Sequence, residues 1–132
     1  MRYVILGRGG HARCVLGSLQ RFATFLRSIE ANVYEVGDAT DADTTAKTAA
    51  FRLVGTDESL VPSDDLLLEN GIRKLDVRKE VYEKMTRRGF AFAVVVDPTA
   101  VVADDVTLSP GCYVGPLAVI RPGCSVGGNT II

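Results

Sequence analysis

The residues with the clearest chemical potential are the glycines that follow the first apolar run of the chain. Gly7, Gly9 and Ala12 have the spacing G-x-G-x-x-A. A glycine-rich turn between a strand and a helix exposes backbone N–H groups at the positive end of the helix dipole, where a phosphate or pyrophosphate is best held. A tight turn without a ligand would have the same spacing. The turn with this spacing runs from Gly7 to Ala12.

His11 is the only histidine of the chain, and histidine is the usual general base near neutral pH. No partner acid or nucleophile is identifiable near it in the sequence. We therefore expect His11 to contact a substrate phosphate or to pack, rather than to act as a base. Arg8 could pair with a phosphate as a charged fork, or stay solvated.

Polar residues after two further strands are candidates for the rest of the site. Asp38, Asp41 and Asp43 follow the second strand, and an acid there could hydrogen-bond a ribose or a base. Asn70 and Gly71 follow the third strong strand, at the carboxyl edge of the sheet, where ligands bind in open α/β folds. Alternatively, the four polar side chains are solvated or structural, and Asn70-Gly71 is a turn that needs positive φ.

The elements that position these residues predict a parallel sheet. Apolar, β-rich runs predict strands at residues 3–6, 32–36, 66–68 and 90–95, with a short or edge strand at 51–54. Apolar stripes at helical spacing predict helices at 15–26 and 76–88, and the polar residues 38–50 predict an exposed loop. Strand, glycine turn, helix and strand form a βαβ unit. We expect an α/β domain of Rossmann-like type over residues 1–95.

Residues 96–132, here called the repeat segment, have a period of six. Aliphatic residues occupy one track: Val96, Val102, Leu108, Val114, Ile120, Val126 and Ile132. A second track of mostly small residues includes Cys112 and Cys124, and turn-forming pairs such as Pro110-Gly111 lie between the tracks. A unit this short cannot bury its apolar residue alone, so successive units must stack. The pattern predicts a hexapeptide-repeat parallel β-helix.

Composition excludes several classes of function. With 15 basic and 16 acidic residues the net charge is −1, which provides no basic surface for nucleic acid. The apolar runs are too short for a signal peptide or a membrane span. Three cysteines without CxxC spacing argue against a disulfide framework and against a zinc site. We expect a cytoplasmic protein without a metal.

The combination resembles the bacterial nucleotide-amino-sugar acetyltransferases of the bacillosamine and perosamine pathways, and the related sialic-acid O-acetyltransferases. Four segments carry the resemblance: residues 4–12 with the Gly-x-Gly-Gly-His turn, 68–71, 78–85, and 96–102 leading into the repeats. The resemblance implies that the first domain binds a UDP-type nucleotide sugar through Gly7, Arg8, Gly9, Gly10 and His11. It also implies that an acid of the Asp38–Asp41 segment holds the base or ribose.

The same resemblance implies that the repeats form a left-handed β-helix, that this prism trimerises, and that acetyl-CoA lies between neighbouring prisms. A histidine later in the helix would act as the general base toward the sugar amine or hydroxyl. Its expected position lies beyond Ile132, and the chain has about two coils. We therefore expect a truncated chain without a catalytic residue, which binds substrate but shows no transfer alone.

Two other functions remain open from the residues. The glycine spacing also fits a nicotinamide-dependent oxidoreductase, which would need a catalytic Tyr, Lys or Cys arrangement and a substrate domain where the repeats lie. A non-catalytic nucleotide-sugar sensor or structural module would need neither.

Overall fold

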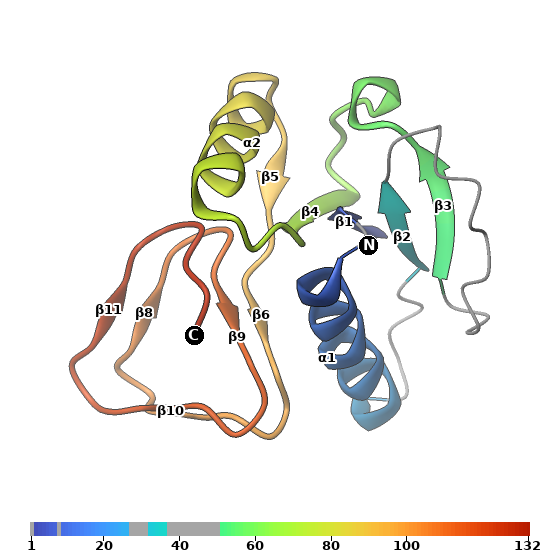
Figure 1. The fold of residues 1–132 in the computed structure, drawn as a ribbon. Coiled ribbons are helices and arrows are strands. Elements are labelled where there is room, and N and C mark those ends of the chain that lie inside the picture. Colours follow the sequence, from blue (N-terminus) through green and yellow to red (C-terminus); the bar gives the residue numbers. More distant parts are fainter. Residues whose placement is uncertain (1, 8, 27–31, 37–50) are drawn as a thin grey trace.

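The N-terminal part of the protein is a five-stranded parallel sheet with a helix on each face (Figure 1). The computed structural model describes residues 2–7, 9–26, 32–36 and 51–132. The sheet order is β3-β2-β1-β4-β5, and every neighbouring pair is parallel. Its strands are β1 (Arg2–Leu6), β2 (Asn32–Val36), β3 (Phe51–Gly55), β4 (Leu66–Asn70) and β5 (Ala91–Phe92). The helices are α1 (Gly10–Leu26), α2 (Leu75–Arg87) and the short 3-10 helix η1 (Asp57–Ser59).

Side chains alternate between the two faces of the sheet along its buried strands, so the core consists of one cluster on each face. On β1, Val4 and Leu6 face a cluster that includes Met85 of α2, whereas Ile5 faces a cluster that includes Val15 of α1. Successive side chains of a strand point to opposite faces, and strands covered on both faces are apolar throughout. This explains why β1 reads as an unbroken apolar run.

Several predicted boundaries differ from the structure by a few residues. The strand predicted at 66–68 continues to Asn70, because residues 69–70 stay in register with Ile5 and Leu6 of β1. Helix α1 begins at Gly10, inside the glycine turn, and α2 begins at Leu75 and ends at Arg87. The predicted edge strand at 51–54 is β3, at the edge of the sheet. The predicted loop at 38–50 lies outside the described residues.

The prediction of one final strand at 90–95 is wrong, because this stretch belongs to two sheets. Residues of β5 pair with β4, whereas the next strand, β6 (Val95–Val96), pairs with β9 of the repeat segment. Ala93 marks the crossing: its N–H donates to Leu68 O at 2.8 Å, and its carbonyl accepts from Gly111 N at 2.8 Å. The chain thus passes from the sheet into the repeats without a linker.

Strands recur every six residues through the repeat segment. They are β6, β7 (Val101–Val102), β8 (Thr107–Leu108), β9 (Tyr113–Val114), β10 (Val119–Ile120) and β11 (Ser125–Val126). β6 pairs with β9, β7 with β10, and β8 with β11, always in parallel and 18 residues apart. Figure 1 shows the chain winding around three sides, with one layer stacked on the next. The aliphatic track is the second residue of each strand.

The corners between these strands use the left-handed backbone region at the same six-residue interval. Gly111 and Gly123 have φ of 81° and 79°, and Leu117 and Asn129 have φ of 60° and 59°. Glycine adopts this region without strain and Asn tolerates it. Leu117, the non-glycine residue with a bulky side chain, donates its N–H to Thr99 Oγ1 at 3.0 Å.

The two cysteines predicted on the inward track differ in environment. Cys112 is buried and Cys124 is exposed. The prediction that both cysteines pack inward is therefore wrong for Cys124. In the described part of the chain, neither long helix has the length and hydropathy of a membrane span.

Candidate functional site

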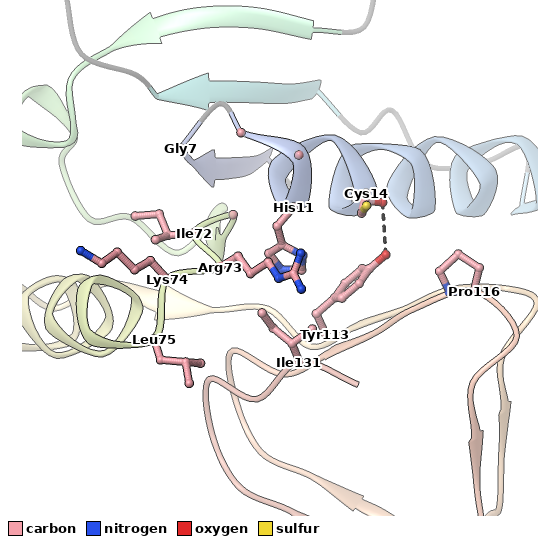
Figure 2. A pocket seen from close by; sticks show the side chains of 13 residues that line it. Gly7, His11, Cys14, Ile72, Arg73, Lys74, Leu75, Tyr113, Pro116 and Ile131 are labelled. Carbon is pink, nitrogen blue, oxygen red and sulfur yellow. Dashed lines mark hydrogen bonds between the residues drawn. The ribbon is translucent and has the colours of Figure 1, made fainter.

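A cavity of about 1020 Å³ lies where the first sheet meets the repeat segment. Three parts of the chain form its walls: the start of α1, the loop from β4 to α2, and the repeat segment (Figure 2). Its lining residues are Gly7, Gly9, Gly10, His11, Cys14, Gly71, Ile72, Arg73, Lys74, Leu75, Tyr113, Pro116 and Ile131. The carboxyl edge of the parallel sheet opens into this cavity, which is where such sheets bind ligands.

Two of the lining glycines are required by the fold itself. Gly7 has φ of +99°, a conformation that side chains rarely adopt. Gly71 does not have positive φ. The alternative that Gly71 serves only a turn with positive φ is therefore wrong. A Cβ on Gly71 would instead lie 2.7 Å from Leu6 O and 2.8 Å from the Ala12 and Ile5 side chains. Gly71 is needed because α1 packs directly against it.

Gly9 and Gly10 are different, because the fold does not require a glycine at either position. Neither has positive φ, and a Cβ at either position would meet no atom within 4 Å. Both residues line the cavity. The missing side chains leave backbone exposed to the cavity at the start of α1, where the first N–H groups of a helix have no partner in the helix. The arrangement suits an anionic group close to the backbone.

His11 projects from the first turn of α1 into the cavity and packs edge-on against Tyr113, with the ring centroids 5.1 Å apart at 82°. Burial, assisted by the positive charges of Arg78 and Arg73, lowers the pKa of His11 to about 4. The ring is therefore neutral at pH 7 and a weak base. Its Nε2 is buried and has no hydrogen-bond partner among the described residues. A neutral ring with one unpartnered nitrogen suits a contact with a ligand.

The charged side chains that the structure describes along the cavity wall are basic. Arg73 and Lys74 line it, and none of the described lining residues is acidic. Sequence reasoning missed both cations, although they follow Asn70-Gly71 directly and so had to lie near the same sheet edge. It also missed Tyr113, which reaches the cavity from the repeat segment. No local pattern in the repeat segment indicates this position of Tyr113.

Arg78 is buried at the junction between the two parts of the protein, with 2% of its surface exposed. It donates to two carbonyls at the end of β4 and just after it, from Nη1 to Asn70 O and to Ile72 O, the latter at 3.1 Å. It also donates to two carbonyls of the repeat segment: Nε to Asn129 O at 2.9 Å and Nη2 to Gly111 O at 3.3 Å. One side chain therefore joins the sheet edge to the repeats.

Asn70 belongs to the same junction. It is fully buried, and its Nδ2 donates to Arg78 O at 2.9 Å and to Asn129 Oδ1 at 3.1 Å. Its Oδ1 accepts from the N–H of Ile72 at 3.2 Å. The side chain is thus occupied in holding the loop behind the cavity, and Asn70 is not among the lining residues.

Asp97 forms a second junction, between α1 and the first coil of the repeats. Its side chain is buried and accepts hydrogen bonds from Ser18 Oγ at 2.6 Å and from Nε and Nη2 of Arg21. Thr99 donates its N–H and its Oγ1, at 2.9 and 2.7 Å. Burial raises the pKa of Asp97, but these hydrogen bonds together hold its pKa well below the ordinary value. Ser18 Oγ also lies 2.9 Å from the Tyr113 hydroxyl.

Glu69, one residue before Asn70, is fully buried. Neither of its carboxyl oxygens has a hydrogen-bond partner in the described part of the chain. Burial raises the pKa of Glu69 well above its ordinary value, although Arg78 and the Asn70 backbone act in the opposite direction. The carboxyl is therefore protonated across an extended pH range.

The structure brings together five of the ten residues that the sequence nominates for the site. Gly7, Gly9, Gly10, His11 and Gly71 all line the cavity. Asn70 lies behind the wall, and Arg8, Asp38, Asp41 and Asp43 lie outside the described residues. Ligand contacts for all ten stay predictions. Within residues 2–7, 9–26, 32–36 and 51–132, no three His, Cys, Asp or Glu residues gather in a way that could hold a metal ion.

Comparisons with known proteins point to one class. No protein-family model and no curated protein matches the chain. Five of the solved structures that match are acetyltransferases, and three of these five are complexes with CoA and a nucleotide-linked amino sugar, GDP-perosamine. The resemblance to nucleotide-amino-sugar acetyltransferases that the sequence indicates is confirmed.

Three of these structures show how far the similarity to this chain extends. The acetyltransferase domain of PglB from Neisseria gonorrhoeae matches over 99% of this chain with a TM-score of 0.83 and 21% identity, which concerns the fold alone. PerB from Caulobacter crescentus, in complex with CoA and GDP-perosamine, matches over the whole chain with a TM-score of 0.75 and 27% identity. A mutant of perosamine N-acetyltransferase from the same organism, in the same type of complex, has a TM-score of 0.73 and 25% identity. The chain spans about 60% of the length of these structures: 61%, 59% and 60%.

Proposed function

We propose that the protein is part of an acetyl-CoA-dependent acetyltransferase for a nucleotide-linked amino sugar, and that the cavity binds the nucleotide-sugar substrate. The observation that carries the proposal is the pair Gly9 and Gly10. The fold has room for a side chain at both positions, so the glycines serve a ligand that approaches the backbone. The N–H groups at the start of α1 would hold its phosphates, and neutral His11 would contact the same ligand.

The two glycines provide the test. In Gly9→Ala and Gly10→Ala, an added methyl group occupies the space where the phosphates would lie. We expect affinity for UDP or GDP to fall at least about tenfold, which corresponds to about 1.4 kcal/mol of binding free energy. We expect the melting temperature to stay the same or rise slightly, since Ala favours helix over Gly. Isothermal titration and thermal unfolding measure the two effects.

The matched control is Gly127→Ala, because Gly127 also has open space around its Cβ position and is not among the lining residues. Its affinity should equal that of the unaltered protein. Binding of UDP or GDP with unchanged affinity in both Gly9→Ala and Gly10→Ala would contradict the proposal. Both nucleotides are tested because the acids nominated for the base, Asp38 and Asp41, lie outside the described residues.

The finer features of the fold belong to the same proposal. We propose that residues 1–95 form a Rossmann-like substrate-binding domain and residues 96–132 the start of a left-handed hexapeptide β-helix. The parallel sheet and the strands at six-residue intervals support this. The general-base histidine that the resemblance implies stays a prediction, since His11 is the only histidine of the 132 residues. Cytoplasmic action follows, because nucleotide sugars and acetyl-CoA would be its substrates.

We further propose that three copies assemble through the repeats and that acetyl-CoA binds between them. The exposed apolar side chains on one side of the coil support this assembly. On β7 and β10 the outward side chains are Val101 and Val119, 64% and 67% exposed and paired in register. On β8 and β11 the corresponding outward residues are Thr107 and Ser125. An apolar face beside a polar one indicates that the apolar face meets another subunit.

Charge on the apolar face should prevent this assembly. In Val119→Asp a carboxylate replaces an apolar contact, and we expect a trimer to become a monomer in sedimentation velocity. Thr107→Asp, on the polar face, adds the same charge and should leave the trimer intact. A protein that is monomeric at high concentration without any substitution would refute the assembly.

The alternative of a nicotinamide-dependent oxidoreductase is distinguished in the same titrations. Binding of NAD or NADP without binding of UDP or GDP would favour it. A protein that binds UDP or GDP but belongs to no active assembly would be a nucleotide-sugar-binding module.

A further inference from the structure

We propose that the Arg73 guanidinium binds the diphosphate of the ligand and makes the site select a nucleoside diphosphate over the uncharged nucleoside. This inference rests on the proposed function, and it assigns the diphosphate a charged partner from the loop between β4 and α2.

The position of Arg73 is the first argument. It lines the cavity, and its charge is close enough to His11 to help lower the pKa of the ring. Figure 2 shows the Arg73 side chain directed toward His11, whereas the side chain of Lys74 points the opposite way. Arg73 therefore faces the start of α1 across the cavity, and a group bound at those N–H groups would lie between the two.

The second argument is that Arg73 is available. Among the described residues it forms no hydrogen bond or ion pair, whereas Lys74 Nζ lies 3.7 Å from Asp76 Oδ2. No described acidic side chain lines the cavity to neutralise it. A planar guanidinium matches two phosphate oxygens at once, so an unpaired arginine here suits a ligand with more than one anionic oxygen.

The third argument is that the loop holding Arg73 is fixed. The preceding residue, Ile72, is held at both backbone groups: its N–H donates to Asn70 Oδ1 at 3.2 Å, and its carbonyl accepts from Arg78 Nη1 at 3.1 Å. The Cα of Arg73 thus has a defined place at the rim, and little conformational entropy of the loop is lost when a ligand binds.

Three variants test the inference: Arg73→Gln, Arg73→Lys and Lys79→Gln. Lys79 is an exposed cation on α2 that does not line the cavity. Titration with UDP and GDP should show a loss of about 10- to 100-fold in Arg73→Gln, the effect of one hydrogen-bonded charge pair. Arg73→Lys should recover part of the loss, and Lys79→Gln should stay within twofold. The dependence of affinity on salt should become shallower in Arg73→Gln alone.

His11 provides a second measurement, since it is the only histidine and gives a single imidazole signal set in proton NMR. Saturation with UDP or GDP should shift these signals in the unaltered protein and also in Arg73→Gln at higher ligand concentration, which shows that the variant keeps its site. Equal affinity of Arg73→Gln and the unaltered protein would overturn the inference and leave the proposed function standing. An equal loss in Lys79→Gln would also overturn it. Absence of binding to the unaltered protein would overturn the proposed function, and the inference with it.

Discussion

Replacing Arg78 with methionine should lower the free energy of unfolding by about 3–5 kcal/mol, because several buried carbonyls would lose their donor at about 1–3 kcal/mol each. Arg78 donates to carbonyls of Asn70, Ile72, Gly111 and Asn129. Methionine fills a similar volume but offers no donor, so buried carbonyls on both sides of the junction lose their partner. Unfolding in urea, followed by circular dichroism, measures the change.

Arg87→Met is the matched control for this experiment. It makes the same chemical change on the same helix at an exposed position, where substitutions usually alter stability by less than about 0.5 kcal/mol. Arg78→Lys should remain close to Arg78→Met, because a single ammonium cannot reach carbonyls on both sides of the junction. A urea midpoint in Arg78→Met equal to that of Arg87→Met would show that the carbonyls find other donors.

Replacing Asp97 with asparagine should lower the free energy of unfolding by about 2–3 kcal/mol at pH 7. The carboxylate accepts from Ser18, Arg21 and Thr99 through both oxygens, and the amide that replaces one oxygen would face donors. The expected loss of folding free energy is moderate because the Arg21 side chain is 45% exposed, so water screens its charge. Asp105→Asn, in an exposed corner of the repeats, is the control and should have little effect.

The effect of Asp97→Asn should also depend on pH in a defined direction. The pKa of Asp97 is lowered in the folded protein, so the unfolded chain takes up a proton first as the pH falls. The stability that the carboxylate contributes is complete above its ordinary pKa of 3.8 and is lost as the pH falls below that value. Thermal unfolding at pH 7 and pH 3 should therefore show a smaller difference between the two proteins at pH 3. An equal difference at both pH values would contradict the role of the charge.

Local patterns in the sequence were sufficient to predict most elements of the fold. The apolar run of β1 and the apolar stripe of α1 show which faces of these elements are buried, because each buried position favours an apolar side chain. The period of six in the repeat segment reports the corners, since each unit needs its own turn. The glycine turn was predictable for the same reason, as its spacing is local.

The junction residues were not predictable, because their partners are far away in the chain. Arg78 has the sequence signature of any solvated arginine on a helix, and its acceptors range from Asn70 to Asn129. Nothing near Asp97 in the sequence indicates its main partners, which lie in α1, 79 and 76 residues earlier. The place of Tyr113 in the cavity wall was not predictable for the same reason, because its partner His11 is also far away in the chain. No periodicity records a contact between two different architectures.

The passage of the chain from β5 to β6 without a linker also bears on the order of folding. Each strand pair of the repeats closes a stretch of 18 residues, whereas β1 must find β4 across 64 residues, from Arg2 to Leu66. The entropy of loop closure makes the longer search costlier by about 1 kcal/mol. Contacts of short sequence separation form sooner. Since β6 continues directly from β5, coils that form early would present β5 and Ala93 as a ready edge, against which β4 and then the rest of the sheet can assemble.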